Sequence, residues 1–471
     1  MMAVKWKPLL SAVPCVLFFS TLFPLNGAKF PNVYPRVKLD ARPNDSAGDP
    51  LMLTPFLKNE SIALAQELSR VSLTETLGIE SHAGFFTVDE KFNSNMYFWY
   101  FPPLSKNEAA PVLLWLQGGP GASSLFGLFT EVGPLVAGKD GFTKREHHWA
   151  KNYHLIFIDN PVGTGFSFTD KDEGYCTDET CIAKGLFAAM DQFFTLFPNL
   201  RANDFYIAGE SYAGKYIPAF GLYVHNLNQE SKRINLKGMA IGNGYCDPLH
   251  QLDYGDYLYQ HGLIDDNQLK TFLKYQLEIS TRIKNGEYST AAYLLDELFD
   301  GEMTKNSMFK TYTGFENSYN FLVSKEEDDM TIYADLLKDD TVRRGVHVGG
   351  LAFNDGLQVL TNLVDDLTRS AAPLLAKLLS HYPIMFYSGQ LDIIVAYPLT
   401  EKFLANLNFS AVIEYKFAPR NIWRVDGDVA GYVRKAGNLT EVLVRNAGHM
   451  VPRDQPKWAF ELITQFINKI L

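Results

Sequence analysis

The sequence predicts a doubly wound α/β fold, with a mostly parallel central sheet, helices on both of its faces and a helical insertion. From about residue 83, short and almost wholly apolar runs alternate with longer helical stretches. Several runs are followed at once by glycine, which suits buried strands whose loops emerge at their carboxyl ends. With 46% hydrophobic and 20% charged residues, the 471-residue chain can bury a sizeable core.

Eight runs have the length and composition of buried strands. They are residues 84–88, 96–101, 112–116, 154–158, 205–208, 238–241, 384–387 and 442–444. Helical patterns follow some of them, as at residues 183–197 and 216–227. This alternation is typical of a sheet covered by helices on both faces.

Residues 247–344 depart from the alternation. They are mostly helical in pattern, charged and rich in Tyr and Leu, as at residues 265–284 and 288–298. We expect a helical cap inserted into the sheet domain rather than a separate second domain, because strand-like runs resume beyond residue 380. The sheet domain then comprises residues 51–246 and 345–471.

Residues 1–27 have the form of a secretory signal peptide. Lys5 and Lys7 precede an apolar stretch over residues 8–25, and small residues follow it. Prolines interrupt this stretch and it is short for a membrane span, which disfavours a signal anchor. We therefore expect cleavage near residue 27 and no membrane anchor. Residues 28–50, rich in Pro, Asp, Asn and Gly, are predicted to form an extended or mobile lead-in.

Glycosylation sequons agree with the secretory route and predict a secreted or lysosomal protein. The candidates are Asn44, Asn59, Asn408 and Asn438. Three of the four cysteines lie beyond the signal peptide, so at least one of them has no partner in the chain. Cys176 and Cys181 are the preferred pair because they are close in sequence, with three unpaired thiols as the alternative.

Charge and histidine patterns exclude several classes of function. With 43 Lys and Arg against 53 Asp and Glu, the net charge of −10 disfavours nucleic acid or an anionic membrane as a partner. The ten histidines form no HExxH pattern, and His147 and His148 are adjacent. No metal and no other cofactor is predicted, while a homodimer stays compatible with the sequence.

The predicted strand at residues 205–208 leads into Gly209-Glu210-Ser211-Tyr212-Ala213-Gly214, and a helical stretch follows. This is the arrangement of a nucleophile elbow, a tight strand-to-helix turn that exposes a serine hydroxyl. The turn requires small residues on both sides of the serine. Gly209 meets that demand, and Ala213 stands where a second glycine is usual. We therefore predict Ser211 as a nucleophile.

A serine nucleophile needs a base and an acid that orients the base. Asp392 follows the predicted strand at residues 384–387, and His449 follows the last predicted strand. The chain order Ser211, Asp392, His449 is the order expected on this architecture. The glycine-rich segment 115–121 follows another strand, and glycine lets backbone N–H groups face a site. We assign the Gly119 and Tyr212 N–H groups to an oxyanion hole. Phosphate binding is disfavoured because no Gly-Lys-Ser/Thr or GxGxxG pattern is present.

These segments resemble the serine carboxypeptidases of the α/β-hydrolase fold, and most of all their vitellogenic-carboxypeptidase-like branch. The matching motifs are WLQGGPGASS (115–124), IDNPVGTGFS (158–167), GESYAGKY (209–216), IGNGYCDP (241–248), YSGQLDIIV (387–395) and GHMVP (448–452). They follow the family order from about residue 50 to the C-terminus. The resemblance implies release of single C-terminal residues from peptides, with the triad and oxyanion donors named above.

The resemblance also implies a group that binds the terminal carboxylate of the substrate. Its members here are Gln117, Gly118, Glu131 and Glu210. Gln117 stands where the family commonly has asparagine. Its amide still donates a hydrogen bond but is one methylene longer, which bears on geometry and substrate preference. A protonated Glu210 next to the nucleophile could donate to the substrate carboxylate, which predicts peptide hydrolysis favoured at acidic pH.

Other functions of this fold remain alternatives. An acyltransferase uses the same triad, with a hydroxyl in place of water in deacylation. A non-catalytic binding or protective protein is a different class, and the complete set of triad and oxyanion residues argues against it. A lipase is disfavoured by the acid pair Glu131 and Glu210. The expected partners are the C-termini of peptides or proteins.

Overall fold

The structure is a computed structural model that describes residues 34–42, 46–139, 141–231, 233–299, 301, 304, 306–325 and 327–471. The predicted signal peptide and the Asn44 sequon lie outside the described residues. Among the helices described, none is both long and apolar enough to serve as a membrane span.

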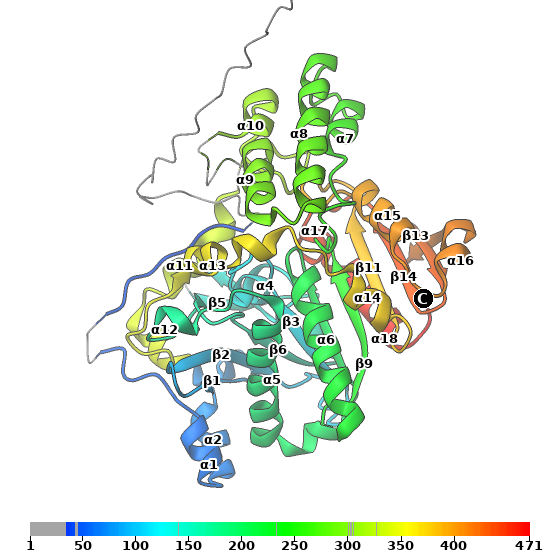
Figure 1. Cartoon of the computed structure of the whole chain (residues 1–471). Coiled ribbons are helices and arrows are strands. Elements are labelled where there is room, and N and C mark those ends of the chain that lie inside the picture. The colour runs from blue at the N-terminus through cyan, green and yellow to red at the C-terminus, as the bar shows by residue number, and fades with distance from the viewer. Residues whose placement is uncertain are drawn as a thin grey trace, which may run out of the picture.

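A ten-stranded sheet runs through the centre of the molecule (Figure 1). In spatial order its strands are β1 (His82–Asp89), β2 (Ser94–Phe101), β6 (His154–Ile158), β3 (Val112–Leu116), β8 (Phe205–Glu210), β9 (Leu236–Gly242), β11 (Ile384–Gly389), β14 (Leu439–Val444), β13 (Asp428–Ala436) and β12 (Asn421–Val425). The strands from β6 to β14 pair in parallel, and the outer strands pair antiparallel. All eight predicted strands are present, so the predicted α/β fold is confirmed.

The predicted strands omitted the edge hairpin β12–β13. In β12 the residues alternate between exposed and buried, so this strand lacks the continuous apolar run of the central strands. Smaller strands also lie outside the main sheet. They are β4 (Leu135–Gly138) paired with β5 (Gly141–Lys144), and β7 (Thr164–Gly165) paired with β10 (Asn354–Asp355).

Helices cover both faces of the sheet because its strands are apolar on both sides. Leu113 and Trp115 of β3 belong to one apolar cluster, together with residues of α4 (Ser124–Thr130) and α18 (Pro456–Ile467). Leu114 and Leu116 belong to the other. The second cluster includes residues of α5 (Glu179–Leu196), α6 (Ala213–Glu230), α13 (Leu357–Leu367) and α14 (Ala372–Leu378).

Shorter elements complete the chain. They are α1 (Thr54–Lys58), α2 (Ile62–Ser69), α3 (Ser72–Glu75), η1 (Trp149–Lys151), η2 (Asp172–Gly174), η3 (Pro198–Ala202), η4 (Asp328–Thr331), α11 (Ile332–Leu336), α12 (Asp340–Gly345), α15 (Tyr397–Asn406), α16 (Val412–Phe417) and α17 (Val451–Asp454).

Four helices stand together above the sheet in Figure 1: α7 (Tyr254–Gln260), α8 (Asp266–Lys284), α9 (Tyr288–Phe299) and α10 (Met308–Thr313). They share an apolar cluster that also contains Ile393, Ala396 and Leu399, from the segment after β11. Tyr333 of α11, in contrast, packs in the cluster of α4 and α18. We propose that the inserted cap consists of α7 to α10, and that α11 and α12 belong to the sheet domain.

The described part of the N-terminal lead-in is anchored to the rest of the protein. Leu39 pairs antiparallel with Phe353, with N–O distances of 3.0 and 2.8 Å. The side chains of Tyr34, Val37 and Leu39 are buried. This described part is held by backbone and side-chain contacts.

A disulfide joins Cys176 to Cys181, and Cys246 is free and buried. The loop between the paired cysteines leads into the first turn of α5. The preferred pairing of the sequence analysis is thus the one in the structure.

Candidate active site

Ser211 lies in the turn between β8 and α6, with a φ of 62°. A left-handed backbone at a non-glycine residue is strained and is typical of functional turns. A Cβ added to Gly209 would lie 2.2 Å from the Leu116 carbonyl and 3.0 Å from the Ala213 Cβ. The turn therefore has no room for a larger residue at Gly209, as the sequence argument required.

His449 and Asp392 lie at the ends of neighbouring strands, after β14 and β11. The His449 Nδ1 is 2.8 Å from the Asp392 Oδ2, and both side chains are fully buried. The His449 Nε2 has no hydrogen-bond partner among the described residues, so it is free to face a substrate or a hydroxyl. Catalytic hydrogen bonds of unliganded enzymes are often long and tighten when substrate binds.

Asn243 connects the serine turn to the acid, and the sequence analysis missed it. Its Nδ2 donates to the Asp392 Oδ2 at 2.6 Å, and its Oδ1 accepts from the Gly389 N–H at 3.2 Å. The preceding residue, Gly242, accepts the Ser211 N–H. Asn243 directly follows β9, and a polar residue at the end of a predicted strand was the signal that could have found it.

The glycine-rich loop after β3 packs directly against the serine turn. A Cβ added to Gly118 would lie 2.6 Å from both the Ser211 Cβ and the Tyr212 N. Only glycine allows this approach, which brings the loop backbone beside the nucleophile. Asp159 holds the end of the loop, because its carboxylate accepts hydrogen bonds from the Ser123 hydroxyl and the Ser124 N–H. Burial raises the pKa of Asp159 to about 7.

Glu131 and Glu210 meet at the amide of Gln117. The Gln117 Nε2 donates to the Glu131 Oε1 at 3.0 Å and to the Glu210 Oε1 at 2.8 Å, and its Oε1 accepts from the Trp115 indole at 2.8 Å. The side chains of Gln117, Glu131 and Glu210 are all buried. No ion pair joins either carboxyl to a base within the described part of the chain.

The environment of the acid pair favours proton uptake. Burial is the main cause that raises the pKa of Glu131 and the pKa of Glu210, and the charge of Glu131 raises that of Glu210 further. The remaining oxygens, Glu131 Oε2 and Glu210 Oε2, are buried without a donor. A proton on either carboxyl would supply the missing donor. The pair is therefore able to hold a proton and to offer it to an anionic ligand.

A second group of buried charges surrounds Tyr212, the residue that follows Ser211. The Tyr212 hydroxyl donates to the Asp366 Oδ2 at 3.2 Å, and the Lys215 Nζ is 2.5 Å from the same oxygen. Glu179 lies beside them, and burial raises its pKa to about 8. The sequence analysis did not find this group, which joins α5, α6 and α13. The group therefore fixes the side chain of Tyr212, the residue that follows Ser211.

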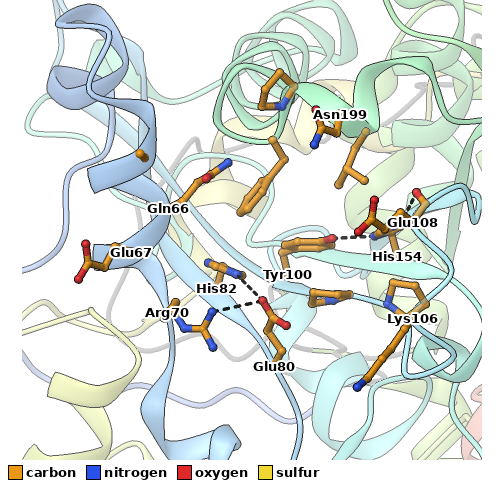
Figure 2. A pocket seen from close by; sticks show the side chains of 16 residues that line it. Gln66, Glu67, Arg70, Glu80, His82, Tyr100, Lys106, Glu108, His154 and Asn199 are labelled. Atoms are coloured by element: carbon orange, nitrogen blue, oxygen red, sulfur yellow. Dashed lines mark hydrogen bonds and ion pairs between the residues drawn. The ribbon is translucent and has the colours of Figure 1, made fainter.

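A hollow of about 870 Å³ lies elsewhere on the molecule, away from these residues (Figure 2). Its walls come from α2, β1, β2 and η3, with His82, Tyr100 and His154 among the side chains that point into it. The 16 lining residues include no serine, threonine or cysteine. The hollow therefore offers no hydroxyl or thiol of serine, threonine or cysteine as a nucleophile.

Within the described residues, no cluster of three His, Cys, Asp or Glu side chains could hold a metal ion. The chemistry available is that of a buried histidine–aspartate pair, a strained serine and glycine-rich backbone. Together with the mostly parallel sheet, this geometry defines a hydrolase of the α/β-hydrolase class.

Comparison with known proteins identifies the family. The serine carboxypeptidase family model matches residues 72–469. The vitellogenic carboxypeptidase of Aedes aegypti is 51% identical over 91% of this chain and 92% of its own length. The venom serine carboxypeptidase of Apis mellifera is 48% identical over 93% and 95%. The chain belongs to the serine carboxypeptidase family and is a serine-type carboxypeptidase, as the sequence motifs predicted.

A solved structure agrees with this assignment. The prohormone-processing carboxypeptidase Kex1 of Saccharomyces cerevisiae aligns with a TM-score of 0.69 and 26% identity. The alignment covers 86% of this chain and 95% of that one. The α/β-hydrolase fold expected from the sequence is confirmed. The Cys176–Cys181 disulfide is consistent with the secretory pathway.

Proposed function

We propose that the protein releases C-terminal residues from peptides through a covalent acyl-enzyme on Ser211. His449 takes the proton of the serine hydroxyl as the oxygen attacks the carbonyl of the last peptide bond. His449 then gives the proton to the leaving amine, and a water molecule activated in the same way hydrolyses the ester. Asp392 holds the histidine by the bond to Nδ1. The 2.8 Å Asp392–His449 contact at the end of the sheet that also presents Ser211 carries this proposal.

The Gly119 and Tyr212 N–H groups would stabilise the negative charge that develops on the carbonyl oxygen. The contact between Gly118 and the serine turn supports this role, because it brings the loop backbone to the reacting centre. Removal of a triad nucleophile leaves only the residual catalysis of binding and of the oxyanion hole.

Substitution of the nucleophile tests the reaction. We expect Ser211→Ala to lower kcat by roughly 10⁶ while the unfolding transition stays close to that of the wild type. A fluorophosphonate probe should label the wild type at Ser211 and leave the variant unlabelled. Persistent labelling of the variant would move the nucleophile elsewhere.

The terminal carboxylate of the peptide is proposed to bind Gln117, Gly118, Glu131 and Glu210. The shared Gln117 amide and the raised pKa values of both glutamates support this, because a neutral carboxyl can donate to a carboxylate. Two charged glutamates would repel a substrate carboxylate. Like charges close together favour proton uptake, so the carboxylate binds when the glutamates hold a proton. The same argument supports peptide hydrolysis favoured at acidic pH.

Peptides with a C-terminal amide test the exopeptidase assignment. Each donor left buried without its partner costs about 1–3 kcal/mol, so amides should be cleaved at least about tenfold more slowly than acids. The release of single residues is followed by mass spectrometry on matched acid and amide peptides. Equal rates would contradict terminal-carboxylate recognition and favour an esterase or an endopeptidase.

A secreted or lysosomal location is proposed on three features. The residues before the lead-in have the form of a signal peptide, and the Cys176–Cys181 disulfide suits an oxidising compartment. Asn59, Asn408 and Asn438 are all exposed. Glycosylation at these three sequons is detectable as a loss of mass on treatment with an N-glycosidase.

A further inference from the structure

Large apolar side chains are exposed where α16 lies beside the β12–β13 hairpin, at the edge of the molecule (Figure 1). Phe417 is 84% exposed, Ile413 64% and Ile422 59%. Ile413 and Phe417 are four positions apart on α16, so they share one face of the helix. Tyr415, between them, is fully buried. Exposed apolar groups that gather in this way mark a surface that binds a partner.

Ile422 belongs to the same surface as α16. Side chains alternate between the two faces of a strand. Trp423 and Val425 of β12 pack in the apolar cluster of α18, so Ile422 and Arg424 point to the opposite face of the sheet. Tyr415 of α16 packs in the cluster on that opposite face. The exposed side chains of α16 and of β12 are therefore neighbours on one side of the sheet.

Three cations lie among these apolar side chains. Lys416, Arg420 and Arg424 are exposed, and within the described residues none of them forms an ion pair. The Arg420 guanidinium carbon is 4.1 Å from the centre of the Tyr432 ring, which attracts a cation. Arg424 donates to the Gly427 carbonyl at 2.8 Å. The surface thus combines protruding apolar groups with positive charge that no neighbouring acid neutralises.

The acids of this region are engaged elsewhere. The Glu414 carboxylate accepts the Gly437 N–H at 3.4 Å, which directs it toward the turn after β13. Asp426 forms an ion pair with Lys457, and Asp428 lies beside the same lysine. The net charge of −10 comes from the whole chain. Salt screens exposed charges beyond about 8 Å, so the local cations decide what this surface attracts.

We propose that this surface docks the protein reversibly on membranes whose headgroups carry negative charge. Its members are Ile413, Lys416, Phe417, Arg420, Ile422 and Arg424. The apolar side chains would enter the boundary between headgroups and acyl chains, and the cations would meet lipid phosphates. A second copy of the chain fits less well. A two-fold contact would bring the same three cations of each copy together, and like charges across an interface repel.

Sedimentation of the full chain with lipid vesicles tests the docking surface. We expect the wild type to sediment with vesicles of equal parts phosphatidylcholine and phosphatidylserine, to stay in solution with phosphatidylcholine alone, and to be released by salt. Lys416→Gln/Arg424→Gln should weaken the partition about thirtyfold, since each cation at the surface is worth about fivefold. Phe417→Ser should weaken it at least about tenfold, because the ring no longer leaves water.

Matched controls are Leu277→Ser, at a leucine that is 69% exposed on the cap, and Lys184→Gln, at an exposed lysine of α5. Both should sediment as the wild type does, and none of the variants should change peptide hydrolysis without vesicles. No sedimentation with phosphatidylserine, or equal sedimentation of the wild type and of the Lys416, Arg424 and Phe417 variants, would overturn the proposal. So would a dimer, seen by light scattering without vesicles, that Phe417→Ser converts to a monomer.

Discussion

Two groups of buried carboxyls flank Ser211, and they differ in how their charge is balanced. In the first group, Glu210 and Glu131 share the neutral amide of Gln117. In the second group, Asp366 has an ion pair with Lys215, and Glu179 lies beside that pair. One group therefore contains no paired cation within the described residues, whereas the other is built around one.

This difference in charge balance indicates that one group recognises the substrate and the other stabilises the fold. A buried carboxyl pair without a cation is costly when charged, and it is stabilised by a proton or by a ligand that needs a donor. A buried ion pair is already satisfied, and it fixes the helices that carry its members. We expect the Gln117 group to control substrate binding and the Lys215 group to control stability.

The largest effect is expected from removing the cation. Lys215→Met leaves Asp366 buried and unpaired, which should lower the free energy of unfolding by about 3–5 kcal/mol. Denaturant unfolding measures this loss. The double variant Lys215→Met/Asp366→Asn removes both charges and should recover much of the stability. A single variant as stable as the wild type would show that the ion pair does not support the fold.

Glu179 is expected to contribute part of the pH dependence of stability, beside Asp159, Glu131 and Glu210, whose pKa values burial also raises. Burial raises its pKa from 4.5 to about 8, so between these values the folded chain binds more protons than the unfolded chain. The stabilisation is complete below pH about 4.5 and is lost as pH rises to about 8, by up to about 1.4 kcal/mol per pH unit. Glu179→Gln should flatten this slope in unfolding titrations, and Glu67→Gln, at an exposed glutamate, should not. An unchanged slope in Glu179→Gln would assign the effect to other groups.

The disulfide should contribute a smaller amount. Cys176 and Cys181 are five positions apart, and closing so short a loop stabilises by about 2 kcal/mol in the chain-entropy account. Glu179 lies inside this loop, at the start of α5. We therefore expect Cys176→Ser/Cys181→Ser to lower the stability by that amount and to reduce the pH slope. Lower stability with the full slope would mean that helix packing alone keeps Glu179 buried.

The smallest expected effect is on substrate binding by the acid pair. In the wild type, KM for a free-acid dipeptide should rise about tenfold per pH unit once the pair loses its proton, because the raised pKa values place that loss well above the usual range for glutamate. Glu210→Gln stays neutral, so its KM should vary little with pH. Glu179→Gln should keep the wild-type profile. A flat KM in the wild type from acidic pH to beyond the Glu131 pKa of about 7 would contradict the shared-proton model.

The same comparison explains what the sequence could predict. The central strands are uninterrupted apolar runs; Ser211 follows one of them directly, and Asp392 and His449 lie in the loops after two others. The carboxyl ends of parallel strands meet at one edge of a sheet. The strand pattern alone therefore predicts that these residues, distant in sequence, lie close together. The strand β12 was missed because it is short and only partly buried, so it lacks the continuous apolar run of the central strands.

The sequence pattern could not identify residues whose contacts depend on long-range packing. Lys215 and Glu179 lie on helices, where a buried charge is indistinguishable from a solvated one until its partner is known. Asp366 comes from a helix beyond the cap. Tyr34 lies in a proline-containing segment with no periodicity. Its hydrogen bond to Glu210 depends on where that segment packs. The composition of residues 28–50 predicted only an extended or mobile chain.

The order of the strands also determines when an active protease can exist during synthesis. β11 lies between β9 and β14, and it is made only after the cap. Until then, the emerging chain presents β9 as an open, apolar edge that needs shielding from other chains. Ser211, the proposed nucleophile, has left the ribosome by this stage, whereas His449, the proposed base, follows only after β14. A nascent chain would carry the proposed nucleophile without its base, so peptidase activity by the proposed mechanism would not arise before β14 is made.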